Sequence, residues 1–147
     1  MQLYASMTVS PSLIDEMYKE LSDRYGTLDP LKPLIYTPIA TGDKLTEKLK
    51  ELSKEGFEIM FDSGGYHVQT NNGDFEELYK YIMPFYEQNR WAHGYVLPDN
   101  VPLSDDDKAT VDQKVKETRS NARLSYYFLP DELKSKADPV IQGSTYE

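Results

Sequence analysis

Short apolar runs alternate with longer amphipathic stretches along this sequence, and this alternation constrains the fold more than any other feature. The strand-like runs are 2–6, 33–41, 57–61, 93–99 and 139–146. Strands separated by helices are typical of parallel sheets with crossover helices, because a tight hairpin turn cannot join parallel neighbours. The chain contains no internal repeat, low-complexity tract or linker. We therefore expect one α/β domain over residues 1–147, built from parallel β-α repeats.

Helix-capping residues mark the first helix of this pattern. Ser10 is a suitable N-cap and Pro11 a suitable first helical residue, so a helix is predicted from there to about Arg24, with Gly26 ending it. One apolar residue recurs every four positions, which predicts a single buried face. This face consists of Leu13, Met17 and Leu21.

Two capping boxes mark later helices. Asp74 with Glu77 predicts the start of one helix, and Ser104 with Asp107 predicts the start of a long helix that runs to about residue 128. Pro84 lies inside the first of these, where proline removes a hydrogen bond and clashes with the preceding turn. We expect it to kink this helix or to break it into two.

The composition narrows the class of protein. With 39% hydrophobic and 28% charged residues, the chain is expected to be a soluble globular protein. No apolar run approaches the roughly 18–20 residues that span a bilayer, and the first residues do not resemble a signal peptide, so we expect a cytoplasmic protein without a membrane partner. The absence of cysteine excludes disulfides, thiolate zinc sites and cysteine nucleophiles, and we expect no metal and no cofactor.

The net charge of −9 argues against phosphate backbones as partners, unless basic residues cluster locally. Such a cluster occurs only over 108–123, where lysines and arginines are interspersed with Asp112 and Glu117. A mixture of both signs is typical of a solvated helix face. Charge alone therefore gives no support for a nucleic-acid partner.

Polar residues follow three of the predicted strands. These segments are 62–65 (Asp-Ser-Gly-Gly), 98–100 (Pro-Asp-Asn) and 142–144 (Gln-Gly-Ser). In parallel α/β folds the carboxyl ends of the strands meet at one edge, and ligands bind there. We therefore expect Asp62, Asp99 and Gln142 to lie at the same edge. Each of these features can also have a purely structural role without a ligand, because Asp is common in turns and helix caps and a Gly-Gly pair usually makes a turn.

The residue types at this edge suit a flat, polar ligand. Gly64 and Gly65 permit close approach of a ligand to the backbone, and Tyr66 beside them offers a ring for stacking. Carboxylates accept hydrogen bonds from N–H groups and an amide donates to a carbonyl, so the set suits the edge of a purine. His67 is more typical of a loop residue than of a metal ligand, because no metal spacing links it to His93.

The same segments resemble a known family. DSGGY at 62–66 resembles the Asp-Ser-Gly-Gly-Phe/Tyr-Gln signature of the tRNA-guanine transglycosylases, the queuine and archaeosine tRNA-ribosyltransferases. LPDNVPLSD at 97–105 is similar to the base-recognising Asp loop of that family, and PVIQGSTYE at 139–147 looks like its Val-Gln-Gly-Gly/Ser strand. The three motifs occur in the family's order. Related transglycosylases that insert 7-deazaguanines into DNA also resemble this pattern.

The resemblance implies a TIM (β/α)8 barrel and the exchange of guanine for a 7-deazaguanine base in tRNA or DNA. The reaction would proceed by attack on the ribose C1′ through a covalent intermediate. By this resemblance, Asp62 would contact the base and take part in proton transfer, Ser63 would help to hold the base, and Tyr66 would stack on it. Asp99 would read the guanine N1 and 2-amino edge. Gln142 and Gly143 would contact the O6 side.

The chain also departs from the family. His67 stands where the family has Gln, and the Asp99 loop lacks the Glu-Cys pair of the bacterial members. A full barrel has eight strands and about 250 residues; the family's nucleophilic Asp and its zinc ligands lie on later strands with no counterpart here. We therefore expect the N-terminal portion of a barrel, with about five strands. It would belong to a longer protein, be completed by a second chain, or remain an open sheet.

Two other functions remain open at this point. One is a non-catalytic subunit that binds a purine and needs a partner chain. The other is an unrelated phosphate- or sugar-binding α/β enzyme, in which the Gly-Gly loop before a helix holds an anion through backbone N–H groups.

Overall fold

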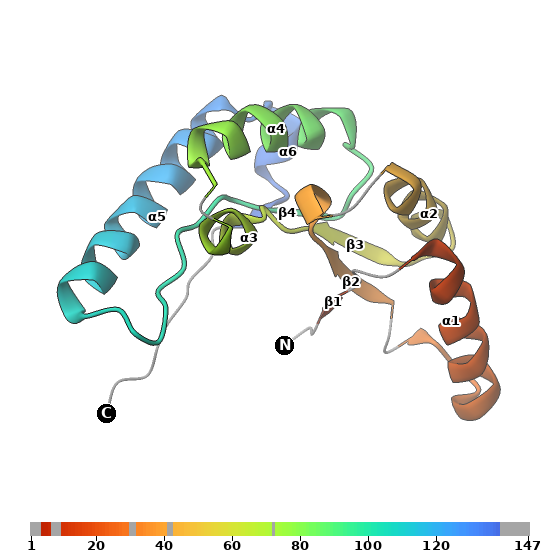
Figure 1. Cartoon of the computed structure of the whole chain (residues 1–147). Coiled ribbons are helices and arrows are strands. Elements are labelled where there is room, and N and C mark those ends of the chain that lie inside the picture. Colours follow the sequence, from red (N-terminus) through yellow and green to blue (C-terminus); the bar gives the residue numbers. More distant parts are fainter. Residues whose placement is uncertain (1–3, 7–9, 30–31, 41–42, 72, 139–147) are drawn as a thin grey trace.

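The computed structural model describes residues 4–6, 10–29, 32–40, 43–71 and 73–138 (Figure 1). Five strands form one sheet in the order β1-β2-β3-β4-β5, and every neighbouring pair is parallel. The expected α/β class with parallel β-α repeats is therefore confirmed. The strands are β1 (Ala5–Ser6), β2 (Pro33–Tyr36), β3 (Glu58–Phe61), β4 (Gly94–Val96) and β5 (Ala137–Asp138).

Most of the helices lie in a layer that covers one face of this sheet (Figure 1). The helical segments are α1 (Pro11–Tyr25), the 3-10 turn η2 (Pro38–Ala40), α2 (Asp43–Lys54), α3 (Gly65–Thr70), α4 (Phe75–Gln88), α5 (Lys108–Phe128) and α6 (Asp131–Lys134). Figure 1 shows α1, α2, α4 and α5 in an arc on one side of the strands. Sequential strand order with right-handed crossovers produces this arrangement, because every crossover then returns on the same face. The order is that of a barrel segment and not of a doubly wound sheet.

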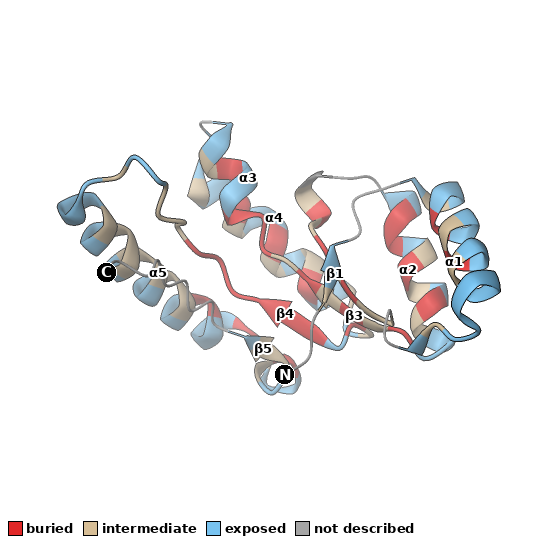
Figure 2. Cartoon of the chain, turned by 90° about the horizontal axis from the view of Figure 1, so that it is seen from below, coloured by how far each residue is buried: buried red, intermediate tan, exposed pale blue. Residues whose placement is uncertain are grey.

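Side chains alternate between the two faces of the sheet. Those directed towards the helices are fully or almost fully buried: Leu34, Tyr36, Ile59, Phe61 and Tyr95. Ile35 and Met60 are paired in register on the opposite face and are only half-buried. Figure 2 shows the molecule from that side, with β4 buried and β1 exposed. The core therefore lies between the sheet and the helical arc.

The first helix has the expected ends but a different buried face. Ser10 is its N-cap, and Gly26 ends it in the left-handed conformation (φ 72°). The buried residues are Ile14 and Tyr18, whereas Leu13 is 41% exposed. The centre of the buried face is therefore shifted by one position from the prediction, while Met17 and Leu21 are half-buried and Met17 packs against the core. Apolar residues occupy adjacent positions in this helix, so the spacing alone does not fix the phase. The edge-on contact of Tyr18 with Phe57, at 5.0 Å between ring centroids, fixes it.

The structure also corrects two predictions about later helices. The helix α4 is capped by Asp74 as expected and continues through Pro84, so the expected alternative of a break into two helices was wrong. Pro84 and Lys80 are both exposed, so the carbonyl left without its N–H partner lies on the solvent side. The long helix α5 begins after Asp107, whose carboxylate accepts from the N–H of Thr110 at 2.7 Å, and Ser104 is not its cap.

The fifth strand begins earlier than expected. It pairs with β4 at Ala137–Asp138, whereas the predicted strand 139–146 lies outside the described residues. Gln142 and Gly143 fall in that segment, so their predicted roles stay predictions.

Candidate functional site

Asp62 and Asp99 lie at the carboxyl ends of neighbouring strands. Asp62 directly follows the last residue of β3, and Asp99 lies shortly after β4. Ser63 connects them, because its hydroxyl donates to Oδ1 of Asp99 at 3.3 Å. Ser63 is fully buried and Asp99 is 5% exposed. The structure thus brings together two segments that the sequence singled out separately.

A third strand end joins this edge through Thr37, which follows β2. The Thr37 hydroxyl donates to Oδ2 of Asp62 at 3.0 Å, and the same oxygen accepts the N–H of Gly64 at 3.3 Å. These bonds fix the orientation of the Asp62 carboxylate. Sequence reasoning missed Thr37, although its place directly after an apolar strand was a usable signal.

The two glycines are required by the chain's own packing. Gly64 has φ of 80°, and a Cβ there would lie 2.5 Å from Cγ2 of Ile39. A Cβ on Gly65 would lie 2.2 Å from the backbone carbonyl oxygen of Asp99. No side chain fits in these spaces, so the helix α3 begins with its backbone in direct contact with the Asp99 loop.

The loop after β4 is anchored on both sides, and the sequence indicated neither anchor. On one side, the Gln69 amide donates to the carbonyl of Val101 at 2.9 Å and accepts the Val101 N–H at 3.0 Å. On the other side, Asn100 donates its N–H to the Thr118 hydroxyl at 2.9 Å and its side-chain amide to Glu117 at 2.6 Å. The segment 99–101 is thus held between α3 and α5.

The aromatic residue proposed for stacking is accessible. Tyr66 lies in the first turn of α3 and is 57% exposed. His67, next to it, is also exposed, but it lies in this helix and not in a loop as expected. Within the described ranges no group of three or more acidic or histidine side chains is arranged to hold a metal ion.

Burial and charge act together on Asp99. Burial raises the pKa of its carboxyl above the ordinary value of 3.8, the negative charge of Asp62 raises it further, and the hydrogen bond from Ser63 opposes both effects. Burial also raises the pKa of Tyr86, to which the charges of Asp62 and Asp99 contribute. This edge is therefore an acceptor-rich site in which one carboxyl binds a proton more readily than usual.

This pKa shift predicts a pH-dependent gain in stability for Asp99→Asn. The folded protein binds the Asp99 proton more tightly than the unfolded chain does, so stability falls as the pH rises from 3.8 through the raised pKa. Asparagine does not ionise, and we expect this variant to melt above the wild type at neutral pH and to lose that advantage below pH 3.8. Exposed Asp105→Asn is the matched control. If the wild type were more stable than Asp99→Asn at neutral pH, the raised pKa of Asp99 would be contradicted.

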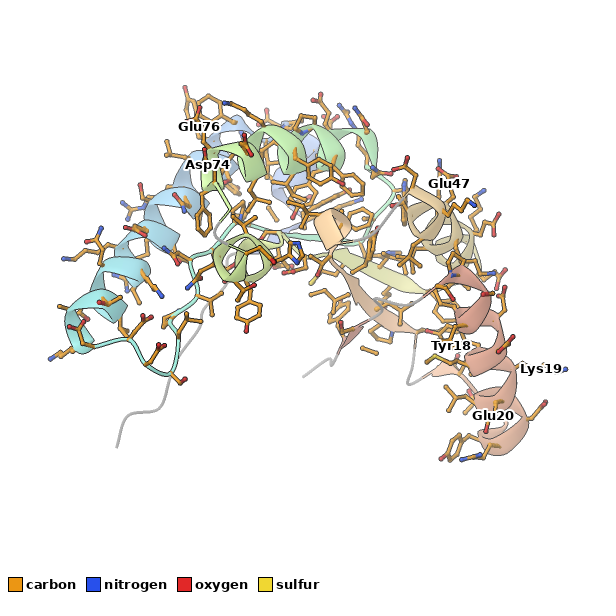
Figure 3. The ribbon with its side chains drawn as sticks, viewed as in Figure 1. Tyr18, Lys19, Glu20, Glu47, Asp74 and Glu76 are labelled. Atoms are coloured by element: carbon orange, nitrogen blue, oxygen red, sulfur yellow. The ribbon has the colours of Figure 1, made fainter. Side chains whose placement is uncertain are left out.

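Many of the other acidic side chains are exposed on the outside of the molecule. Figure 3 shows Glu20, Glu47 and Glu76 projecting outward from α1, α2 and α4.

A separate apolar groove of about 450 Å³ lies between α4 and α5. Its lining includes Tyr79, Met83, Leu124 and Phe128, and neither Asp62 nor Asp99 contributes to it.

Among the helices of the described residues, none combines the length and apolar character that a membrane crossing needs. Comparison with protein-family models, with curated proteins and with solved structures finds no match to this chain.

Proposed function

We propose that the edge formed by Asp62, Ser63 and Asp99 binds a guanine-type base. The observation that carries this proposal is the Ser63–Asp99 hydrogen bond, which unites two segments 36 residues apart at the carboxyl ends of β3 and β4. The chain would be the base-binding part of a cytoplasmic enzyme similar to queuine tRNA-ribosyltransferase. Such an enzyme exchanges guanine for a 7-deazaguanine in tRNA or DNA.

The chemistry of the two carboxyls supports this ligand. Guanine presents an N1–H and a 2-amino group side by side, and a carboxylate accepts from both. Adenine offers an acceptor at N1 and lacks the 2-amino group, so it cannot donate this pair of hydrogen bonds to Asp99. In this proposal Asp99 reads that edge, Tyr66 stacks on the base, and Asp62 contacts it and transfers a proton.

The hydrogen bonds of the glycine loop favour a base over an anion. The N–H of Gly64 donates to the Asp62 carboxylate at 3.3 Å, and the N–H of Gly65 donates to the Ser63 hydroxyl at 3.3 Å. These donors already have partners inside the protein. A phosphate would also meet the negative charges of Asp62 and Asp99, which disfavours the alternative of an anion-binding enzyme.

The sheet supports a role as part of a larger catalytic unit. The helical arc covers one face, and Ile35 and Met60 on the opposite face are only half-buried. We propose that further β-α units, from the same protein or from a second chain, complete the barrel and contribute the nucleophile. Base binding then belongs to this chain, and transfer to the ribose requires those units.

Thermal melting with matched ligands tests the proposal. We expect 7-deazaguanine to raise the melting temperature by several degrees at about 100 times its Kd, which corresponds to about 2.7 kcal/mol of stabilisation. We expect no shift with 7-deazaadenine or inorganic phosphate. Asp99→Asn should abolish the shift and Asp105→Asn should retain it. Stabilisation by phosphate without stabilisation by 7-deazaguanine would favour the anion-binding alternative.

A further inference from the structure

Gln69 is the one side chain of α3 that bonds both backbone groups of a residue in the Asp99 loop, among the contacts of the described residues. Gly65 and Gln69 lie four residues apart and therefore on the same face of α3. Gly65 abuts the carbonyl of Asp99, and Gln69 holds Val101, two residues further along the loop. One face of this short helix thus contacts the loop at two successive points.

We propose that Gln69 is a positioning residue of the base site: by holding Val101 it keeps the Asp99 carboxyl in place beside Ser63. A primary amide can donate and accept at the same time, which matches the N–H and C=O of one backbone residue. Two such bonds fix both the distance and the orientation of the loop relative to α3. The identity of the ligand in this inference, a guanine-type base, rests on the proposed function. The Gln69–Val101 contact is observed independently of that function.

The second anchor of the loop, on α5, restricts the effect of losing Gln69 to the contact between the loop and α3. Asn100 is bonded to Thr118 through both its N–H and its C=O, so α5 continues to hold the loop when the Gln69 contact is removed. We expect the loop to separate from α3 while the fold is retained. The Asp99 carboxyl would then move away from Ser63 and from Asp62, and would gain water.

The test uses Gln69→Met, which retains most of the side-chain volume and loses both hydrogen bonds. Gln88→Met, at the exposed end of α4, is the matched control. The first readout is the pKa of Asp99, followed through its carboxyl carbon by nuclear magnetic resonance. We expect this pKa to fall towards 3.8 in Gln69→Met and to be unchanged in Gln88→Met. An unchanged Asp99 titration in Gln69→Met would overturn the inference.

The second readout is the affinity for 7-deazaguanine. We expect Gln69→Met to bind at least about tenfold more weakly than the wild type, and Gln88→Met to bind equally well. Wild-type affinity in Gln69→Met would overturn the positioning role. Absence of binding by the wild type would instead refute the proposed function, and the Asp99 titration would then decide the positioning role alone.

A measurement on the wild type covers the case in which Gln69→Met does not fold. The Val101 amide proton is expected to exchange with solvent at least about tenfold more slowly than that of exposed Ser104, because it is bonded to Gln69. Equal exchange rates at the two positions would show that the Gln69 contact does not persist in solution, and the inference would fail.

Discussion

Replacing Phe61 by alanine is expected to lower the free energy of unfolding by about 3–5 kcal/mol, as for other large aromatic side chains removed from a core. Phe61 is fully buried at the end of β3. Its ring lies 5.0–6.4 Å, between centroids, from those of Tyr36, Phe85, Tyr86, Trp91 and Tyr95. These rings cannot all close the resulting cavity, so the contacts of several strands and helices are weakened together.

Urea denaturation measures this loss. The matched control is Phe128→Ala, because Phe128 is 72% exposed at the end of α5 and its removal should change stability by no more than about 0.5 kcal/mol. Phe61 also directly precedes Asp62, so we expect Phe61→Ala to lose affinity for 7-deazaguanine as well. A loss of stability below about 1 kcal/mol would show that this aromatic cluster is not the centre of the core.

Gly65→Ala is expected to destabilise the fold by about 1–3 kcal/mol and to abolish base binding. A Cβ at this position would lie 2.2 Å from the carbonyl oxygen of Asp99 and 2.9 Å from its Oδ1. The nearest obstacle is backbone, so a rotamer change cannot relieve the overlap. The Asp99 loop and α3 must therefore move apart, and the Ser63–Asp99 hydrogen bond is lost.

The control for this variant is Gly26→Ala. Nothing lies within 4 Å of a Cβ at Gly26, although its φ of 72° makes alanine cost about 1 kcal/mol. Calorimetric titration with 7-deazaguanine should therefore show full affinity for Gly26→Ala and none for Gly65→Ala. Wild-type affinity in Gly65→Ala would contradict the close contact between α3 and the Asp99 loop.

The sequence was sufficient to predict the arrangement of the strands and part of the site. The alternation of apolar and amphipathic runs predicted the parallel sheet, and parallel strands necessarily direct their carboxyl ends to one edge. Asp62 and Asp99 could therefore be placed together before the structure was known. The cap at Asp74 was likewise predictable from its neighbouring residues, whereas the same local reasoning chose Ser104 in place of the actual cap Asp107.

The missed features depend on contacts between distant segments. The helix α3 has six residues, too few for a periodic apolar pattern, and its initial Gly-Gly pair is typical of a turn. Gln69 reaches a partner 32 residues away, and Thr37 reaches one 25 residues away. The phase of α1 depended on the packing of Tyr18 against Phe57. No local pattern carries this information.

The most direct test of the base site is to locate the bound base. Amide resonances of ¹⁵N-labelled protein would be followed during titration with 7-deazaguanine. We expect saturable shifts concentrated at 63–66 and 99–101, and no such shifts with 7-deazaadenine. Absence of saturable shifts, or shifts concentrated at the groove between α4 and α5, would contradict the proposal that Asp62, Ser63 and Asp99 form a guanine-binding site.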